Sequence, residues 1–151
     1  MANPGHLAKL KEGVEKWNQW RRDHILMHPD LTNADLAGVY LSHADFREVD
    51  LRCASLVEAE LAEAELNRAD LTGANLRKAD LKRADLSEAN LSGADLTGAN
   101  ASETDLSEAN LSGADLRGAF LLRVDLYCAN LTRANLSGAD LRVANFSGAE
   151  L

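Results

Sequence analysis

The chain has 151 residues, enough for one domain with a buried core, but only 5% of them are aromatic, and Leu and Ala dominate the 46% that are hydrophobic. Its formal net charge of −8 at pH 7 argues against a general affinity for nucleic-acid phosphates or for an anionic membrane surface. No apolar run approaches the roughly 18 residues of a spanning helix, and the N-terminus lacks a secretory signal pattern. We therefore expect a cytoplasmic protein with no direct contact to nucleic acid or membrane.

Residues 1–28 carry the first predicted element, a single capping α-helix. Asn3 suits the N-cap and Pro4 the first helical position, and apolar residues follow at steps of three and four, namely Leu7, Leu10, Val14 and Trp17. The dipeptide His28-Pro29 predicts the end of this helix. With five basic and three acidic side chains, the segment would also suit a membrane-surface helix. We favour a cap over one end of the following structure, because capping already accounts for the apolar stripe.

From Asp30 to Leu151 the chain repeats every five residues as A(D/N)LXX. The central residue is Leu, except at Phe46, Ala101 and Phe146, and the residue two places earlier is Ala, except at Val39, Val49, Thr104 and Val124. A period of five fits neither the 3.6 of a helix nor the 2 of a strand, so the chain must turn a corner in each repeat. Stacked coils would then bury a column of Leu walled by Ala, which is typical of a solenoid.

Tandem A(D/N)LXX repeats resemble the pentapeptide-repeat family, and the segment WNQWR at Trp17–Arg21 is similar to the caps of small cyanobacterial members. The resemblance implies an all-β solenoid, a right-handed quadrilateral β-helix of about six 20-residue coils over residues 29–151, with the capping helix over residues 1–28. Glycine placement supports four sides independently. Of the eight Gly in the second variable place, seven fall on two adjacent faces when the repeats are sorted in steps of twenty.

With this register, residues twenty apart stack about 4.8 Å from one another. One such column alternates in sign above His43, in the order Glu63, Arg83, Glu103, Arg123. Stacked opposite charges stabilise β register by roughly 0.2–1 kcal/mol per pair, less when exposed. We interpret the column as a structural charge ladder, with a recognition stripe as the alternative.

The repeat changes character towards its C-terminal end. Phe120 fills an outward place that is normally Asp or Asn, Leu122 and Val143 point outward on the same face, and Tyr127 lies round the corner. The last coil has no sequence-encoded cover and contains Phe146 and Leu151. We predict an interaction surface comprising Phe120, Leu122, Tyr127, Val143, Phe146 and Leu151, and a homodimer through the C-terminal coil. A frayed last coil, a truncated chain, or apolar surface residues without a role are the alternatives.

Two other irregularities occur in the repeat. Tyr40 also replaces an outward Asp or Asn, and we expect it to pack against the capping helix. Ala101 lies between Leu81 and Leu121 in a core column, and Thr104 replaces a nearby inward Ala. Losing a Leu side chain from a packed column costs about 2–5 kcal/mol when the surroundings do not relax, so we expect a weak point there.

No constellation of residues predicts catalysis. The His and Cys residues lack metal-ligand spacing, and no phosphate-binding loop or nucleophile elbow occurs. Cys53 and Cys128 fall on different faces about 18 Å apart along the axis, which excludes a disulfide between them. We therefore predict a non-enzymatic structural or protein-interaction module without a cofactor. The alternative, suggested by the family resemblance, is a DNA-mimic modulator of a type II topoisomerase such as gyrase.

Overall fold

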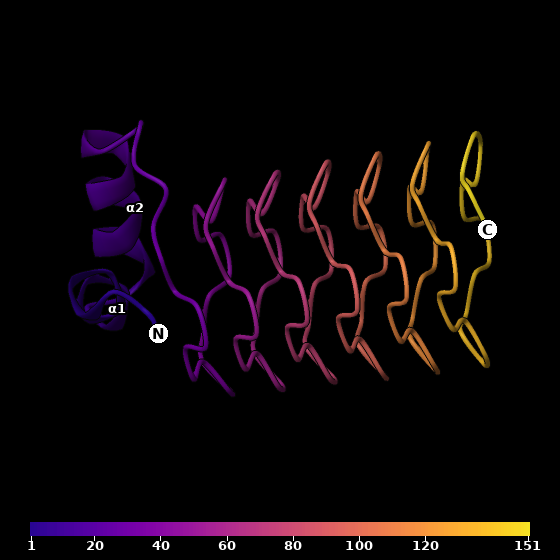
Figure 1. Cartoon of the computed structure of the whole chain (residues 1–151), viewed down its shortest axis with the longest axis horizontal. Coiled ribbons are helices and arrows are strands. Elements are labelled where there is room, and N and C mark those ends of the chain that lie inside the picture. The colour runs from indigo at the N-terminus through magenta and orange to yellow at the C-terminus, as the bar shows by residue number, and fades with distance from the viewer.

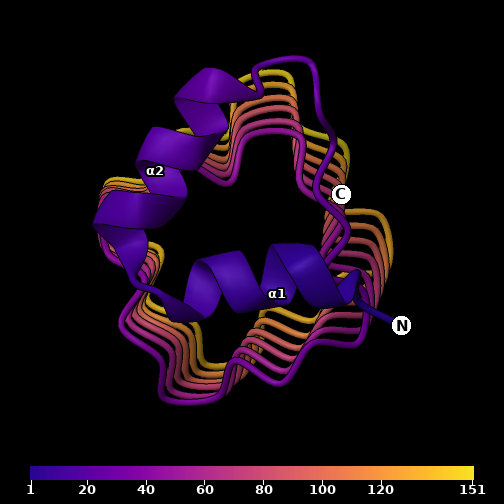
Figure 2. The same cartoon turned by 90° about the vertical axis from the view of Figure 1, so that its left-hand side faces the viewer.

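A computed structural model describes residues 1–151 as a stack of coils with two short helices, α1 (Pro4–Lys11) and α2 (Val14–Asp23), across one end (Figure 1). Seen along the stack, the coils lie in register behind one another, α1 crosses the open end of the first coil, and α2 lies along one side of it (Figure 2). The chain therefore forms a solenoid with its long axis perpendicular to the coils.

Each five-residue repeat contains one tight turn. In the first repeat the N–H of Ala34 donates to the carbonyl of Leu31 at 3.0 Å, and Asn33 has a φ of 56°. A positive φ at the third residue identifies a type II turn. The equivalent residue has a positive φ in every later repeat up to Gly148, which explains why Gly recurs at this place.

Parallel backbone bridges join each residue before a central Leu to the residue twenty positions later, from Asp30↔Asp50 to Asn130↔Glu150. The N–H of Asp50 donates to the carbonyl of Pro29 at 2.9 Å, and the N–H of Leu31 donates to the carbonyl of Asp50 at 2.8 Å. The predicted twenty-residue period is confirmed. The right-handed sense and the count of about six coils stay predictions.

The β structure consists of isolated bridges, and no named strand forms. The turn in every repeat limits each side to one bridged residue, but neighbouring N–H groups also donate to the next coil, as Leu31 does to Asp50 and Asn33 does to Arg52. The molecule is a β-helix of tight corners joined by short backbone ladders.

The core is a column of central residues walled by small ones, as the pattern predicts. Every central residue from Leu31 to Leu131 is at most 2% exposed, and so are nearly all of the Ala residues between them. Trp17 of α2 is fully buried and extends this core into the cap, where its ring centre lies 5.7 Å from that of Phe46. The cap and the coils therefore share one continuous core.

The single capping helix predicted over residues 1–28 is wrong, because the chain breaks at Gly13 into two helices. Gly13 has a φ of 106°, a conformation that favours glycine. The predicted start is confirmed, since the side chain of Asn3 accepts from the N–H of Gly5 at 2.9 Å and Pro4 follows it. The predicted end of the helix at His28-Pro29 is wrong, because α2 stops at Asp23 and the chain turns before it reaches that dipeptide.

Side chains of α2 take the place of a preceding coil. The Trp17 indole Nε1 donates to the carbonyl of Asp45 at 2.8 Å. Asn18 accepts from the N–H of Asp45 at 2.8 Å and donates to the carbonyl of His43 at 2.9 Å. These groups belong to the free edge of the first coil, which would otherwise present unpaired backbone to water. The predicted capping role is therefore carried out by specific hydrogen bonds as well as by apolar contact.

Candidate interaction surface

Four of the predicted surface residues lie on the outside of the coils. Phe120, Tyr127 and Val143 are 54%, 48% and 76% exposed, and Leu122 is half-buried. Phe120 pairs through its backbone with Asp140, so Leu122 and Val143 lie on the same side of adjacent coils. Tyr127 lies on the following side. We call these four residues the apolar patch.

The other two predicted residues belong to the last coil. Phe146 occupies a central position of the last coil, faces inward and packs partly against the core, so that it is half-buried. Leu136 and Leu141 are likewise half-buried. Leu151 is 81% exposed.

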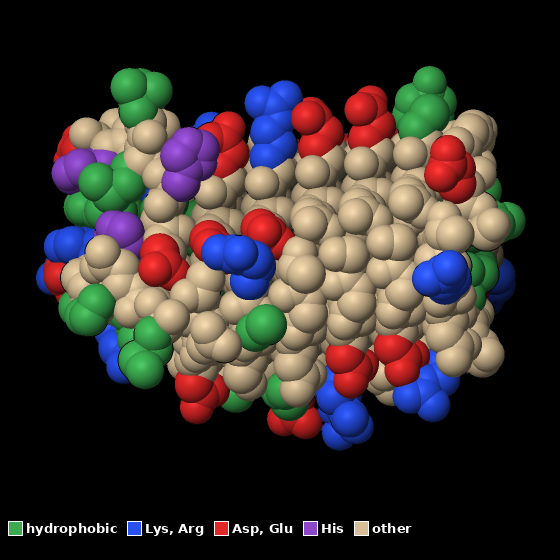
Figure 3. All heavy atoms as spheres, viewed as in Figure 1, with side chains coloured by type: hydrophobic (Ala, Val, Ile, Leu, Met, Phe, Trp, Pro, Cys, Tyr) green, Lys and Arg blue, Asp and Glu red, His purple; other side chains and the backbone are tan.

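Large exposed hydrophobic side chains fall into two groups along the chain. One runs from Met1 to Tyr40 and the other from Phe120 to Leu151, with none between. Space-filling Figure 3 shows hydrophobic side chains concentrated near the two ends of the visible face. Tyr40 is 75% exposed, so its predicted packing against the cap is wrong, because the cap contacts the first coil at Asp30 and at residues 43–47 instead.

The predicted charge ladder forms as two separate pairs. Arg83 Nε lies 3.0 Å from Glu103 Oε2, and His43 Nδ1 lies 3.5 Å from Glu63 Oε2. Arg123 lies within ion-pair distance of no carboxylate. The hydrogen bond from Arg83 holds the pKa of Glu103 below its usual range. Both partners are well exposed, so each pair contributes little to stability.

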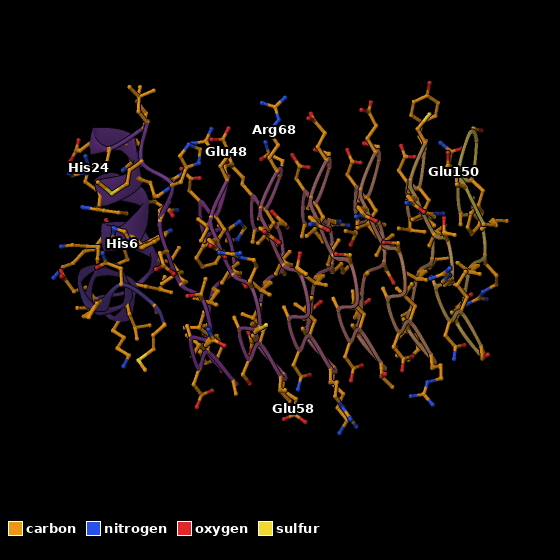
Figure 4. All side chains as sticks on the ribbon, in the orientation of Figure 1. His6, His24, Glu48, Glu58, Arg68 and Glu150 are labelled. Atoms are coloured by element: carbon orange, nitrogen blue, oxygen red, sulfur yellow. The ribbon has the colours of Figure 1, made fainter.

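Sequence reasoning missed two further sets of ion pairs. A neighbouring column joins Arg68 Nε to Glu88 Oε2 at 2.9 Å, and Figure 4 labels Arg68 and Glu48 of this column. Within single repeats, the residue after the centre pairs with the one before it, as in Arg47–Asp45, Arg52–Asp50, Arg117–Asp115 and Arg142–Asp140. The pattern D(L/F)R, which occurs at each of these places, would have revealed them. These pairs neutralise part of the acidic surface.

The rest of the surface offers little for small-molecule chemistry. The largest hollow, about 550 Å³, is shallow and lined by Asp23–Met27 alone, away from the apolar patch. No group of three or more His, Cys, Asp or Glu side chains is placed to hold a metal ion. Cys53 and Cys128 are exposed, free thiols. Neither helix has the length and apolar character needed to cross a membrane.

Residues 30–151 match the family model for pentapeptide repeats in eight copies, over 30–67, 64–100, 84–121, 104–142 and 125–151. The chain is similar to a pentapeptide repeat protein from the cyanobacterium Cyanothece 51142, with 27% identity over 88% of this chain and 96% of that one, and a TM-score of 0.54. It is also similar to HetL of the cyanobacterium Nostoc sp. strain PCC 7120, described as involved in heterocyst differentiation regulation, with 35% identity over 78% of this chain and 68% of HetL, and a TM-score of 0.47.

A third solved structure, the plasmid-mediated fluoroquinolone resistance protein QnrB1, is 22% identical over 80% of this chain and 71% of its own, with a TM-score of 0.50. At that identity the likeness concerns the fold alone. No curated protein matches the chain in sequence. The resemblance predicted from A(D/N)LXX, including the cyanobacterial relatives, is confirmed.

Proposed function

Because the chain belongs to the pentapeptide-repeat family, we propose that it is a non-catalytic protein-interaction module that binds a partner protein through the apolar patch. One observation carries this proposal: Phe120 is 54% exposed in a place that the repeat fills with a polar residue everywhere except at Tyr40. Together with Leu122, Tyr127 and Val143 it exposes apolar area on an otherwise polar surface, which is typical of a contact site. Two of the four residues are aromatic, the type enriched in interface centres.

The interior supports the same proposal by offering no competing site. Its Leu and Ala columns are close-packed, whereas a ligand pocket needs a concave space with a few convergent polar groups. Recognition must therefore use the outer surface of the coils. Beyond the first coil, large exposed hydrophobic side chains occur only from Phe120 onward.

The patch is tested with a variant that restores the repeat. Phe120→Asn with Leu122→Ser gives the polar residues found at the same places in the preceding coil, Asn100 and Ser102, so the variant should fold and melt like the parent. We expect at least tenfold weaker capture of the partner from a source-cell extract, as measured by quantitative mass spectrometry, because loss of two central contacts costs over about 1.4 kcal/mol.

Tyr40→Asn is the matched control. Tyr40 occupies the same column as Phe120 at the other end of the molecule and is also exposed, so it changes the same chemistry away from the patch. It should leave capture unchanged. If the same proteins were recovered in equal amounts with the patch variant, the apolar patch would be excluded as the binding surface.

A second copy of the chain is one partner that this end could bind. Leu136, Leu141 and Phe146 are only half-buried there and would gain burial in a homodimer through the C-terminal coil. Light scattering after size exclusion should give twice the mass of 16.3 kDa at micromolar concentration. A mass of one chain would contradict the homodimer while leaving a different partner for the patch.

A second candidate function is DNA mimicry on a type II topoisomerase such as gyrase. It is favoured by five acidic residues stacked in consecutive coils, Asp45, Glu65, Asp85, Asp105 and Asp125. Charge density opposes it: residues 29–151 carry a net −10 over roughly 30 Å, against about 17 phosphate charges on duplex DNA of that length. Inhibition of purified gyrase in a supercoiling assay would support mimicry, and unaltered supercoiling at micromolar protein would remove it.

A further inference from the structure

All four histidines lie in the cap or beside it, and one of them differs from the others in the role of its ring nitrogen (Figures 3 and 4). His6 Nδ1 lies 3.0 Å from the backbone nitrogen of Asp30. A backbone N–H only donates, so this ring nitrogen accepts and carries no proton. In contrast, His24 Nδ1 faces the carbonyl of Trp20 at 2.8 Å, where it donates.

The remaining two histidines face carboxylates. His28 Nδ1 lies 3.4 Å from Glu48 Oε2, and His43 Nδ1 lies 3.5 Å from Glu63 Oε2. Protonation keeps the donated bond of His24 and turns both of these contacts into ion pairs. Only at His6 does protonation remove a hydrogen bond that the folded structure contains.

The bond to His6 stands where a preceding coil would otherwise supply the acceptor. In the next coils the equivalent N–H groups donate to a backbone carbonyl, as Asp50 does to Pro29 and Asp70 does to Val49. Asp30 begins the first coil and has no such neighbour, so His6 replaces it. The carbonyl of Asp30 accepts from the N–H of Asn3 at 3.0 Å, which places two contacts of the α1 segment on one residue.

We propose that protonation of His6 releases α1 from the first coil, so that this half of the cap opens reversibly as the pH falls from neutral. Protonated Nδ1 would direct an N–H at the N–H of Asp30, which removes the bond and leaves a part-buried donor without a partner. Histidine is the side chain whose charge ordinarily changes between pH 5 and 8. α2 stays in place, because Trp17 and Asn18 bind it to the first coil through hydrogen bonds and neither side chain is ionisable.

Some charged groups around His6 favour its protonation and others oppose it. None of them supplies a new acceptor for the N–H of Asp30. The Asp30 carboxylate attracts a protonated His6, but it already accepts from the N–H of Thr32 at 2.9 Å. The N-terminal amino group also acts on the Asp30 carboxylate and would repel a protonated His6. On α1 itself, Lys9 is paired with Glu12 at 2.9 Å. From α2, the ring centre of Trp20 lies 5.4 Å from that of His6 and 4.9 Å from that of His24.

Hydrogen exchange measured by NMR on the full chain tests the proposal. Between pH 7.5 and 5.5, protection factors corrected for intrinsic exchange should fall about tenfold for the Asp30 amide and for the amides of α1, and stay constant in α2. His6→Asn keeps a side-chain acceptor that does not titrate, so its protection should not depend on pH. His43→Asn, at an exposed corner with a φ of 60°, is the matched control and should behave like the parent.

Constant protection in the parent chain would overturn the proposal, and so would an equal loss in His6→Asn. If the Asn side chain is too short to reach the N–H of Asp30, the variant will be unprotected at both pH values. The parent chain alone then tests the proposal. The nitrogen-15 titration of His6 Nδ1 must then share its midpoint with the loss of protection at Asp30. A different midpoint would assign the opening to another group.

Discussion

Ala101 occupies a place that Leu fills in the coils on either side, and it is 1% exposed. Thr104, also 1% exposed, turns its hydroxyl to the carbonyl of Leu81 and donates to it at 2.7 Å. The turn bond from the N–H of Thr104 to the carbonyl of Ala101 is 3.4 Å, against 2.9 Å for Ala84 and Leu81 one coil earlier. The buried hydroxyl is therefore satisfied, and the turn bond is longer here than in the preceding coil.

Ala101→Leu should raise the free energy of unfolding by about 2 kcal/mol, the lower end of the cost of a Leu-to-Ala change in a core. Urea unfolding measures this directly, and the midpoint of thermal unfolding should rise by about 4–8 °C. Ala119→Leu is the control. It adds the same bulk to a wall position that is 1% exposed, and overpacking there should cost about 1–3 kcal/mol. A loss of stability in Ala101→Leu would mean that the column narrows at this coil.

The direction of each side chain could be predicted from the sequence, whereas the choice of ion-pair partner could not. When each five-residue repeat turns one corner, only one arrangement of the side chains places both Leu and Ala inward. Arg83, however, has Glu63 below it and Glu103 above it, and it pairs with Glu103. The order of residues in the column is the same whether Arg83 pairs with Glu63 or with Glu103. The side-chain conformation of Arg83 therefore determines its partner.

The cap is anchored by a buried charge pair as well as by apolar contact. Arg21 of α2 is 5% exposed and donates to the carbonyls of Met27 at 2.8 Å and Arg47 at 2.7 Å. Its Nε has no hydrogen-bond partner and lies 3.7 Å from Asp45 Oδ1. Burial raises the pKa of Asp45, but the hydrogen bonds from Arg47 and the charge of Arg21 outweigh burial and hold this pKa below its usual range.

Asp45→Asn should destabilise the protein by about 2 kcal/mol at pH 7, because it leaves Arg21 without a counter-charge. A lowered pKa in the folded state means that Asp45 contributes stability above the ordinary Asp pKa of about 3.9, and that this contribution is lost as the pH falls through the folded value. Urea unfolding at pH 7 and pH 3 should therefore show a gap between the parent and Asp45→Asn that narrows in acid.

Asp85→Asn provides the control for this change. Asp85 lies in the same column, two coils further along, and accepts from the N–H of Ser87 without an arginine partner. Its substitution should cost less than about 0.5 kcal/mol, as at an ordinary surface site. Equal losses for both variants would show that the pairing with Arg21 and Arg47 does not stabilise the cap.

The sequence predicted a cap but not its division, for a reason visible in its residues. Leu7, Leu10, Val14 and Trp17 keep helical spacing straight through Gly13, so periodicity alone gives no sign of a break. The glycine at position 13 was the available indication that the helix breaks there. The contacts of Asn18 and Arg21 depend on which backbone groups of the first coil remain unpaired. A local sequence pattern does not predict which groups these are.

Across the whole molecule, each coil contacts only its neighbours, since every backbone bridge joins residues twenty apart. Stability is then close to a sum over coils and the interfaces between them. The cap closes one end and the exposed hydrophobic groups lie towards the two ends, so the middle coils differ little from one another. The number of coils, and so the length of the molecule, can therefore change without altering the packing of the remaining coils.

Deletion of residues 71–90 should leave a folded protein shorter by about 4.8 Å, because it removes one coil and rejoins the repeat in register. Deletion of residues 71–88 removes nearly as much chain but interrupts the five-residue period. Small-angle scattering and thermal unfolding should show a compact, cooperative rod for the first variant and a strongly destabilised chain for the second. Similar unfolding of both would contradict the independence of the coils.

The spacing of the bridges also sets the order in which the chain can fold during synthesis. α1 and α2 emerge from the ribosome before any coil, and they already carry Trp17, Asn18 and His6, the partners of the first free edge. Each later coil then needs only the twenty residues just made and the edge beneath it. At a translation rate of about 5–20 residues per second, a new coil becomes available about every 1–4 seconds. Folding can thus keep pace with the ribosome, with only one growing edge exposed at any time.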